Sequence, residues 1–317
     1  MEVRLMQIGF VGLGKMGGNM VTRIRRDSDL EVVAFDFNAD AVKAAEERGA
    51  QGADSLEALV GKLSAPRAVW VMVPAGQATE ETIDKLLGLL DEGDLIVDGG
   101  NSKWTDSVAH HAKCRERGVH FLDVGTSGGV WGLSIGYCMM VGGDDEAVKL
   151  LTPVLNVLAP HDDADDAEPK YGWGHMGGPG SGHFVKMIHN GIEYGLMQAY
   201  AEGFDLIHSS DYGLDSEQIA KLWSQGSVIR SWLLELAARA FEADGNDLAS
   251  LEGWVDDSGE GRWTLDAGIA HDVPMPTLAA ALFARFGSRG AGDYSARMVA
   301  ALRNQFGGHA VKTAPRV

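Results

Sequence analysis

A glycine turn between a short apolar segment and a helical pattern restricts the possible folds of this chain more than any other stretch. The apolar segment covers residues 7–11, and the turn Gly12-Leu-Gly14-Lys-Met-Gly17 leads into apolar residues at helical spacing. Glycines at these positions allow a tight turn, a close approach of the backbone to a pyrophosphate, and close packing of the helix on the strand. The helix N-terminus adds free N–H donors and a positive dipole. The pattern predicts a dinucleotide-binding strand, turn and helix.

The acidic residue at the end of the next apolar segment favours one dinucleotide. Residues 31–35 end at Asp36, which lies about 20 residues after the glycine turn, as in dinucleotide-binding folds. A carboxylate there accepts hydrogen bonds from the adenosine ribose and repels a 2′-phosphate. Phe37 and Asn38 follow and supply no arginine for such a phosphate. The sequence therefore favours NAD over NADP, with a purely structural glycine turn as the alternative.

Apolar segments and helical patterns continue to alternate after this point. We expect strands at residues 68–73, 95–97, 120–124 and 138–143, and helices at residues 39–48, 56–60, 78–90 and 106–117. This alternation predicts a Rossmann-type, doubly wound parallel sheet with helices on both faces.

Ligands bind such sheets at the loops that follow the strands. Asn101, which follows two glycines, is expected beside the nicotinamide, although a role in forming the turn would also explain it. The predicted cofactor-binding residues are Gly12, Leu13, Gly14, Lys15, Met16, Gly17, Asp36, Val73, Pro74 and Asn101.

A second glycine-rich turn, residues 125–129, follows the expected strand at 120–124. Consecutive backbone N–H groups in such a turn can hold carboxylate or phosphate oxygens without a side-chain charge. An acidic stretch at residues 161–169 is interpreted as a solvated loop, and a calcium site is the less favoured alternative because the spacing differs from an EF-hand loop.

Strand patterns disappear after Gly180, and helical patterns occupy residues 182–207, 216–225, 230–241 and 276–285. We therefore expect two domains: a dinucleotide-binding Rossmann-type domain at residues 1–178, and an all-helical domain for substrate binding and dimerisation at residues 179–317. A chain of 317 residues with 45% hydrophobic content is large enough for both cores.

The net charge of −18 makes nucleic acids and anionic membranes unsuitable partners. The two cysteines, Cys114 and Cys138, form neither a disulfide framework nor a metal-ligand spacing, and we expect reduced, buried thiols. No signal peptide or membrane-spanning apolar run is evident, which predicts a cytoplasmic protein.

A polar stripe on the first helix of the second half is the candidate active site. Lys186, His189, Asn190 and Glu193 are spaced i, i+3, i+4 and i+7, so they share one helix face. Apolar residues on the other sides predict a buried helix, in which ionisable groups must be paired or face a wet pocket. A solvated surface patch is the alternative.

These motifs resemble the 6-phosphogluconate dehydrogenases, which are decarboxylating members of the β-hydroxyacid dehydrogenase superfamily. The resemblance rests on GLGKMG at 12–17, DVGTSGG at 123–129 and GHFVKMIHNGIEYGLMQ at 182–198, and it covers nearly the whole chain. The last motif is the most specific. The chain lacks most of the C-terminal helical duplication of the longer NADP enzymes, so it is similar to the short, NAD-preferring bacterial type.

The resemblance implies oxidative decarboxylation of 6-phospho-D-gluconate to D-ribulose 5-phosphate and CO₂, with hydride transfer to NAD. It implies Lys186 as the base at the C3 hydroxyl, Glu193 as the acid that protonates C1 of the enediol formed after CO₂ leaves, and Asn190 as a third catalytic group. The substrate contacts it implies are Asn101, His189 and Asn190 for the hydroxyls, Ser127, Gly128 and Gly129 for the carboxylate end, and Tyr194 and Arg285 for the phosphate.

The resemblance also implies that Arg303 and His309 reach the active site of a neighbouring subunit in a homodimer or homotetramer. No metal is expected. A family lysine is replaced here by Ser258, so phosphate binding would depend more on arginines. Two alternatives remain: a non-decarboxylating dehydrogenase for a smaller acid such as 3-hydroxyisobutyrate, and an inactive NAD sensor. The first alternative requires neither Glu193 nor the Arg303 to His309 tail, and the intact set of Lys186, Asn190 and Glu193 argues against the second.

Overall fold

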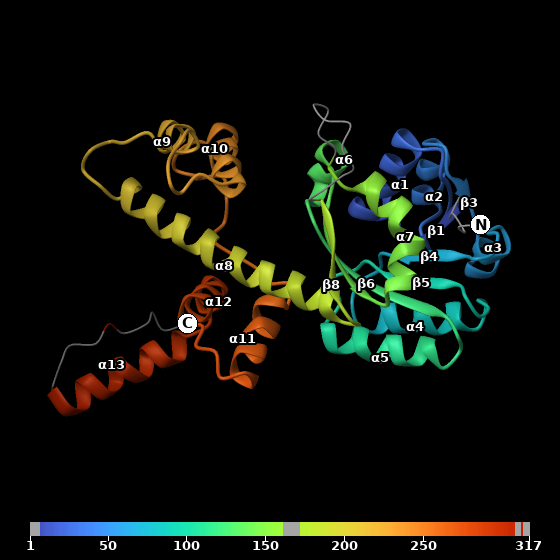
Figure 1. Ribbon diagram of the computed structural model, residues 1–317. Coiled ribbons are helices and arrows are strands. Elements are labelled where there is room, and N and C mark those ends of the chain that lie inside the picture. The colour runs from blue at the N-terminus through green and yellow to red at the C-terminus, as the bar shows by residue number, and fades with distance from the viewer. Residues whose placement is uncertain (1–6, 161–171, 308–311, 313–317) are drawn as a thin grey trace. The chain divides into compact units, whose positions relative to one another are not determined.

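The computed structural model describes residues 7–160, 172–307 and residue 312 (Figure 1). The chain divides into two compact units: residues 1–188, called here the sheet unit, and residues 189–317, called the helical unit. The division falls inside one long helix, beyond the domain boundary expected at residue 178. Each unit is described by itself.

The sheet unit alternates strands and helices. Its elements are β1 (Gln7–Val11), α1 (Lys15–Asp27), β2 (Glu31–Phe35), α2 (Ala39–Glu46), β3 (Gln51–Gly52), α3 (Leu56–Gly61), β4 (Ala68–Val71), α4 (Gln77–Leu87), β5 (Leu95–Asp98), α5 (Trp104–Arg115), β6 (His120–Ser127), the 3₁₀ helix η1 (Gly129–Trp131), α6 (Gly132–Ile135), β7 (Cys138–Gly143), α7 (Asp145–Leu158) and β8 (Trp173–Gly177).

The described strands form one eight-stranded sheet in the order β3-β2-β1-β4-β5-β6-β7-β8. All neighbouring pairs are parallel except β6 and β7, which run antiparallel. The expectation of a wholly parallel sheet is therefore wrong at this edge. The connection of residues 128–137 is too short for a crossover, since parallel strands need a dozen or more connecting residues.

Five elements of this unit were not expected from the sequence, including the 3₁₀ helix η1 and the short helix α6. Strand β3 has only two residues, and β8 reads WGHMG, which lacks strand-like alternation and is ordered by its pairing with β7. Helix α7 contains Pro153, a residue that usually interrupts a helical pattern.

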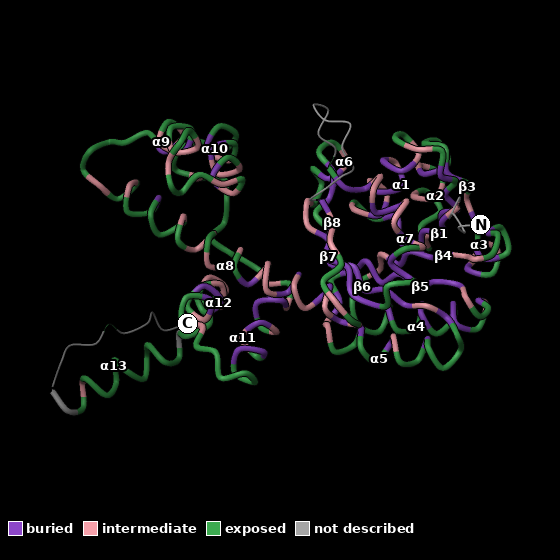
Figure 2. Tube along the Cα trace, in the orientation of Figure 1, coloured by how far each residue is buried: buried purple, intermediate pink, exposed green. Residues whose placement is uncertain are grey.

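Each face of the sheet carries its own apolar core because successive strand residues point to opposite sides. In β4, Trp70 packs on the face covered by α1 and α7, whereas Val69 and Val71 pack on the face covered by α3, α4 and α5. Figure 2 shows the inner strands buried along almost their whole length, whereas the edge strands β3 and β8 are half-buried or exposed. This burial on both faces confirms the doubly wound architecture.

The described part of the helical unit contains no strand, as expected. Its elements are the remainder of α8 (Ser181–His208), α9 (Ser216–Trp223), α10 (Trp232–Asp244), α11 (Glu260–Ala270), α12 (Pro276–Ser288) and α13 (Asp293–Gly307). Helices α11 and α13 were not expected from the sequence. Asp215 and Ser231 cap α9 and α10 by accepting the N–H groups of Gln218 and Leu234.

The prediction that α8 is buried on all sides is wrong from Ile192 onward. Lys186 and Met187 are buried, but Ile192 is 60% exposed, Leu196 44% and Leu206 74% (Figure 2). The apolar cores of the helical unit are small, and each covers only part of the helix surface. The sequence shows which residues of α8 are apolar, but it does not show which of them are buried by the rest of the chain.

Cys114 is buried, and burial raises its pKa to about 12. Cys138 is exposed at the start of β7, so the expectation of two buried thiols is wrong for this residue. In the described parts of the chain, no helix is both long and apolar enough to cross a membrane.

Candidate functional site

The glycine turn between β1 and α1 borders a pocket of about 500 Å³ in the sheet unit. Gly12 has a φ of 94°, which favours glycine, and a Cβ there would lie 2.5 Å from the Met72 carbonyl oxygen. A Cβ on Gly17 would lie 2.1 Å from the Gly12 carbonyl oxygen, so Gly17 lets α1 pack on the turn. A Cβ on Gly14 meets nothing within 4 Å. Gly14 therefore presents bare backbone to the pocket, which suits the approach of a pyrophosphate.

Helix α1 begins at this pocket with its donors available. Its N-cap position is Gly14, which provides no side-chain cap, and no acidic residue lies in its first turn. Lys15 and Met16 line the pocket at the helix N-terminus. Unpaired N–H groups and the helix dipole at this point favour an anionic ligand.

Asp36 lies at the edge of the same pocket and is fixed by two backbone donors. Its Oδ2 accepts the Leu13 N–H at 2.6 Å, and its Oδ1 accepts the Asn38 N–H at 2.8 Å. Each carboxylate oxygen keeps further acceptor capacity, which a ribose hydroxyl can use. Leu13 itself is buried, and its amide serves Asp36, so its contribution is to position the carboxylate.

The pocket lies where the strand order reverses between β1 and β4, the usual ligand position in this kind of sheet. Val73 and Pro74 line it after β4, and Asn101 lines it after β5. Sequence reasoning missed further lining residues, namely Val11, Phe35, Phe37, Met72, Ala75, Gly99, Gly100 and Thr126. The strand ends indicated these loops, but only the folded chain shows which side chains face the pocket.

The second glycine turn begins where β6 ends. Gly128 has a φ of 130° and Gly129 a φ of 52°, so both lie in the region that favours glycine. Thr126, near the end of β6, lines the cofactor pocket, and the turn follows it through Ser127. The predicted substrate-binding turn and the pocket therefore share one strand end.

Lys186 is 7% exposed and packs against that same strand. A Cβ on Gly125 would lie 2.3 Å from the Lys186 Cβ, so a glycine at this position in β6 makes room for the lysine stem. A Cβ on Gly182 would lie 2.5 Å from the carbonyl oxygens of Asp123 and Met140. The first turn of α8 thus lies directly on β6 and β7, which places Lys186 beside Gly125 of β6.

A buried carboxylate that sequence reasoning missed holds the start of α8. Asp123 is fully buried, its Oδ1 accepts the Gly180 N–H at 2.7 Å, and its Oδ2 accepts the His183 N–H at 2.8 Å. These are donors that a helix N-terminus leaves unpaired, so Asp123 caps α8 from a neighbouring strand. The His183 Nδ1 also lies 2.7 Å from the Ser107 Oγ of α5. Lys186 is therefore carried by a helix fixed on two sides.

The other groups of the predicted polar stripe lie in the helical unit. His189 Nδ1 lies 2.9 Å from Asn190 Oδ1 and 3.9 Å from Glu193 Oε2. Asn190 Nδ2 donates to Glu260 Oε1 at 2.6 Å. His189 and Glu193 are about two-fifths exposed. The structure therefore brings the three predicted groups together and adds Glu260, which had no motif to reveal it.

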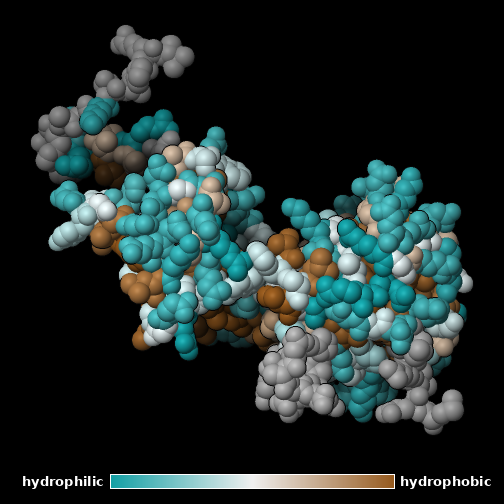
Figure 3. Space-filling view, turned by 90° about the horizontal axis from the view of Figure 1, so that it is seen from above, coloured by the Kyte–Doolittle hydropathy of each residue, from teal (hydrophilic) through white to brown (hydrophobic). Residues whose placement is uncertain are grey.

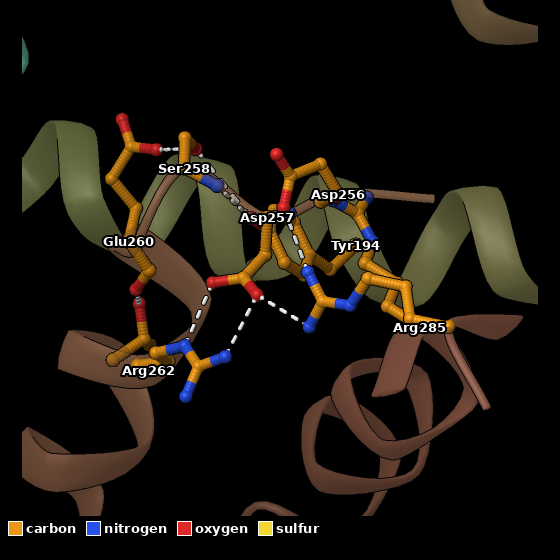
Figure 4. A network of polar contacts seen from close by, with 9 residues as sticks. Tyr194, Asp256, Asp257, Ser258, Glu260, Arg262 and Arg285 are labelled. Atoms are coloured by element: carbon orange, nitrogen blue, oxygen red, sulfur yellow. Dashed lines mark hydrogen bonds and ion pairs between the residues drawn. The ribbon is translucent and has the colours of Figure 1, made fainter. Parts of the chain in front are cut away.

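Tyr194 and Arg285, the predicted phosphate-binding residues, are also brought together. The Arg285 guanidinium stacks on the Tyr194 ring at 3.5 Å from the ring centroid, and its Nη1 donates to the Asp256 carbonyl oxygen at 3.1 Å (Figure 4). The Tyr194 hydroxyl accepts the Ser258 N–H at 3.3 Å. The loop of residues 256–258 therefore holds both side chains in one arrangement.

Two further arginines fix this loop. Asp257 accepts two hydrogen bonds from Arg262, at 2.8 and 2.9 Å, and one from Arg289 at 3.0 Å (Figure 4). Hydrogen bonding to Arg262 is the main cause that lowers the pKa of Asp257 to about 2, and Arg289 adds to it. The carboxylate is thus ionised throughout the physiological range, and Asp256 Oδ1 also accepts a hydrogen bond from Arg289 at 2.7 Å.

The predicted contacts of Arg303 and His309 with a neighbouring subunit stay a prediction. Arg303 lies on the exposed surface of α13, and His309 lies outside the described residues. The acidic stretch considered as a calcium site, residues 161–169, lies entirely outside them. Among residues 7–160, 172–307 and 312, no group of three or more His, Cys, Asp or Glu side chains is arranged to hold a metal ion.

Comparison with known proteins gives both units the same assignment. Residues 7–164 match the model of the NAD binding domain of 6-phosphogluconate dehydrogenase. Residues 182–293 and 208–316 match the model of the C-terminal domain of 6-phosphogluconate dehydrogenase.

Similar proteins carry the same family name. The chain is 46% identical over 306 residues to the NAD(+)-dependent, decarboxylating 6-phosphogluconate dehydrogenase of Haloferax volcanii, covering 96% of this chain and 98% of that protein. It is 36% identical to the decarboxylating enzyme of Treponema pallidum, covering 88% of this chain but only 58% of that protein.

Solved structures agree on the fold. The 6-phosphogluconate dehydrogenase of Plasmodium falciparum matches with a TM-score of 0.79 and 27% identity, covering 98% of this chain and 67% of that one. A 3-hydroxyisobutyrate dehydrogenase of Mycobacterium tuberculosis shares the fold at 24% identity, with a TM-score of 0.69 and coverage of 91% and 94%. The chain therefore belongs to the 6-phosphogluconate dehydrogenase family.

Proposed function

We propose that this protein oxidatively decarboxylates 6-phospho-D-gluconate to D-ribulose 5-phosphate and CO₂, with NAD as the hydride acceptor. The observation that carries the proposal is the position of Lys186. It is a buried lysine on a capped helix, packed on the strand whose end borders a dinucleotide pocket. Asn190 and Glu193 follow one and two turns later on the same helix.

The pocket suits a dinucleotide because the turn supplies bare backbone at Gly14, an uncapped helix N-terminus, and the fixed carboxylate of Asp36. When bound, NAD accepts the hydride that leaves C3 of the substrate. Asp36 binds the adenosine ribose hydroxyls and repels a 2′-phosphate, so NAD is preferred over NADP. The name of the Haloferax volcanii relative, an NAD(+)-dependent enzyme, supports this preference.

Lys186 acts twice in the proposed reaction. As a neutral amine it takes the proton of the C3 hydroxyl, and it returns that proton to the C3 oxygen as the C1–C2 bond breaks and CO₂ leaves. Glu193 then delivers a proton to the carbon that held the carboxylate. About 10 Å of helix axis separates the two residues at 1.5 Å per residue, which suits groups that serve different carbons of one sugar acid.

Substrate binding is divided among the remaining predicted residues. Ser127, Gly128 and Gly129 hold the carboxylate end, and Asn101, His189 and Asn190 hold the hydroxyls. Arg285, stacked on Tyr194, binds the phosphate together with Arg303 and His309. A guanidinium fork suits a phosphate because it offers paired donors in one plane.

A homo-oligomer is part of the proposal, with the C-terminal segment of one subunit reaching the site of another. Apolar side chains that lie next to one another on the surface of the helical unit support it, because monomers rarely expose large contiguous apolar patches (Figure 3, left). On α13, Tyr294, Met298 and Leu302 are each about half exposed or more and lie one turn apart. Light scattering together with activity at nanomolar dilution tests this, and a monomer that stays fully active would contradict it.

A spectrophotometric assay with 6-phosphogluconate tests the function directly. NAD and NADP are supplied in parallel, CO₂ is measured, and 3-hydroxyisobutyrate serves as the alternative substrate. We expect CO₂ release with 6-phosphogluconate and a higher kcat/KM with NAD. Oxidation of 3-hydroxyisobutyrate without turnover of 6-phosphogluconate would reject the proposal, and a higher kcat/KM with NADP would reject the cofactor preference.

A further inference from the structure

A buried carboxylate at the start of α11 contacts the proposed substrate-binding residues but belongs to none of the motifs. Glu260 is 2% exposed. A carboxylate withdrawn from water is costly unless its oxygens are hydrogen bonded. Its Oε1 accepts the Asn190 Nδ2–H at 2.6 Å. Its Oε2 accepts the Ser258 hydroxyl, as Figure 4 shows.

We propose that Glu260 is a positioning residue that fixes the amide of Asn190 and, through it, the tautomer of His189. The inference rests on the proposed function, in which Asn190 and His189 bind the substrate hydroxyls. Glu260 itself touches neither substrate nor cofactor in this proposal.

The orientation of the Asn190 amide follows from the nature of its neighbour. An asparagine side chain donates from one side and accepts on the other, whereas a carboxylate only accepts. Glu260 therefore holds the Nδ2 side, and the Oδ1 side is turned towards His189 Nδ1, 2.9 Å away. Removing Glu260 removes this constraint on which end of the amide faces His189, because the two ends have nearly the same shape.

The orientation of the amide in turn decides the state of the imidazole. Asn190 Oδ1 only accepts, so His189 Nδ1 carries the hydrogen. In the neutral ring Nε2 is then the acceptor. His189 in this tautomer accepts a hydrogen bond from a substrate hydroxyl at Nε2, whereas the opposite tautomer would donate one.

Close packing between α8 and α11 keeps Glu260 in place. A Cβ on Gly191 would lie 2.9 Å from the Thr264 Cγ2, so the two helices touch at a glycine. The Thr264 hydroxyl donates to the Glu260 carbonyl oxygen at 2.7 Å, which ties the first turn of α11 together. The carboxylate reaches Asn190 from a fixed backbone position, which is what a positioning role requires.

The experiment compares Glu260→Ala with Glu260→Gln in the full-length protein. The glutamine variant keeps an oxygen for the Asn190 Nδ2–H and an N–H for the Ser258 hydroxyl, so it preserves orientation without charge. Glu57→Ala is the matched control, since Glu57 is an exposed carboxylate in the first turn of α3. Circular dichroism and thermal unfolding show that each variant is folded.

We expect Glu260→Ala to lower kcat/KM for 6-phosphogluconate about ten- to a hundredfold, the range for a lost charge-assisted hydrogen bond. The KM for 6-phosphogluconate rises while the KM for NAD is unchanged. Glu260→Gln stays within about threefold of the wild type, because its neutral hydrogen bond is only modestly weaker. Equal losses in both variants would show that charge rather than orientation matters, which overturns the proposal.

The tautomer is measured independently of activity by ¹⁵N NMR of histidine-labelled protein, with His189→Gln to assign the signal. We expect the Nδ1–H form in the wild type and in Glu260→Gln, and a mixture in Glu260→Ala. An Nε2–H form in the wild type overturns the proposal without any variant, even if Glu260→Ala fails to fold. If the wild type does not turn over 6-phosphogluconate, the proposed function fails, but the tautomer still decides the role of Glu260.

Discussion

The sheet unit and the helical unit hold their predicted functional groups by different means. In the sheet unit, Lys186 depends on backbone: glycines at 125 and 182 bring α8 onto the strands, and Asp123 caps the helix through main-chain N–H groups. In the helical unit, the Glu260 side chain holds Asn190, and the Tyr194 ring holds Arg285 together with the Asp256 carbonyl oxygen.

This difference matches the cores of the two units. The sheet unit has a large apolar core on each face of its sheet, whereas the helical unit has two small ones. A substitution disturbs a contact between backbones only if the new side chain enters the space between them. A contact between two side chains is lost when either residue is replaced. In the sheet unit, substitutions of a few glycines should therefore have large effects. In the helical unit, replacing either member of an interacting pair of side chains should disturb the other member.

The largest expected loss of activity is at Lys186, which α8 holds against the sheet through backbone contacts. Lys186→Met should lower kcat about a thousandfold, since general acid–base groups contribute about 10²- to 10⁴-fold. NAD binding, measured by fluorescence titration, should be unchanged because the glycine turn is intact. Lys149→Ala, at an exposed lysine of α7, is the control. Substantial turnover by Lys186→Met would remove this residue from its role as base.

The phosphate-binding pair in the helical unit should give the next largest effect. Arg285→Ala should raise the KM for 6-phosphogluconate about ten- to a hundredfold, as expected for a lost hydrogen bond to a charged group. Arg285→Lys keeps the charge but loses the planar stack on Tyr194, and should raise KM about three- to tenfold.

Steady-state kinetics with Arg230→Ala as the control checks this comparison, because Arg230 is an exposed arginine in the helical unit. Equal KM values for the lysine and alanine variants would mean that the fork and the stack, rather than the charge, account for the binding. An unchanged KM in both would contradict the assignment of the phosphate site.

Two glycines of one turn should separate binding from stability in the sheet unit. Gly17→Ala should destabilise the protein by about 1–3 kcal/mol, because its Cβ would meet the Gly12 carbonyl oxygen at 2.1 Å. Gly14→Ala should leave the melting temperature unchanged and raise the Kd for NAD about tenfold or more, since its Cβ would enter the open pocket. Calorimetry and fluorescence titration measure the two effects. If both variants melted like the wild type, backbone contact would not be what holds the turn.

The smallest expected effect concerns Asp257 in the helical unit. Its pKa of about 2 in the folded protein lies below the ordinary value of 3.8. Its contribution to stability is therefore present above pH 3.8 and is lost as the pH falls towards 2. Asp257→Asn should lower the free energy of unfolding by about 1–2 kcal/mol at pH 7, reduced from the full linkage value because its partner Arg262 is half exposed.

Urea unfolding at pH 7 and between pH 4 and 2.5 measures this term, with Asp205→Asn as the control at an exposed position of α8. The gap between Asp257→Asn and the wild type should narrow below pH 4. A gap that stays constant down to pH 2.5 would show that the stabilisation does not come from the ionised carboxylate.

The sequence by itself determined the elements whose signal is local. The glycine turn, the acid at Asp36 and the alternation of apolar segments are short-range patterns, and they identified the dinucleotide fold and its pocket. The spacing of Lys186, Asn190 and Glu193 likewise depends only on helix geometry.

Only the tertiary structure decided what depends on pairs of residues distant in the chain. Strand β8 is ordered by its pairing with β7, and β7 runs antiparallel because its connection to β6 is short. Asp123 caps a helix that begins nearly sixty residues later, and Glu260 meets an amide seventy residues earlier. A carboxylate in the sequence carries no mark of the partner it will meet, because that partner is chosen by packing rather than by neighbouring residues.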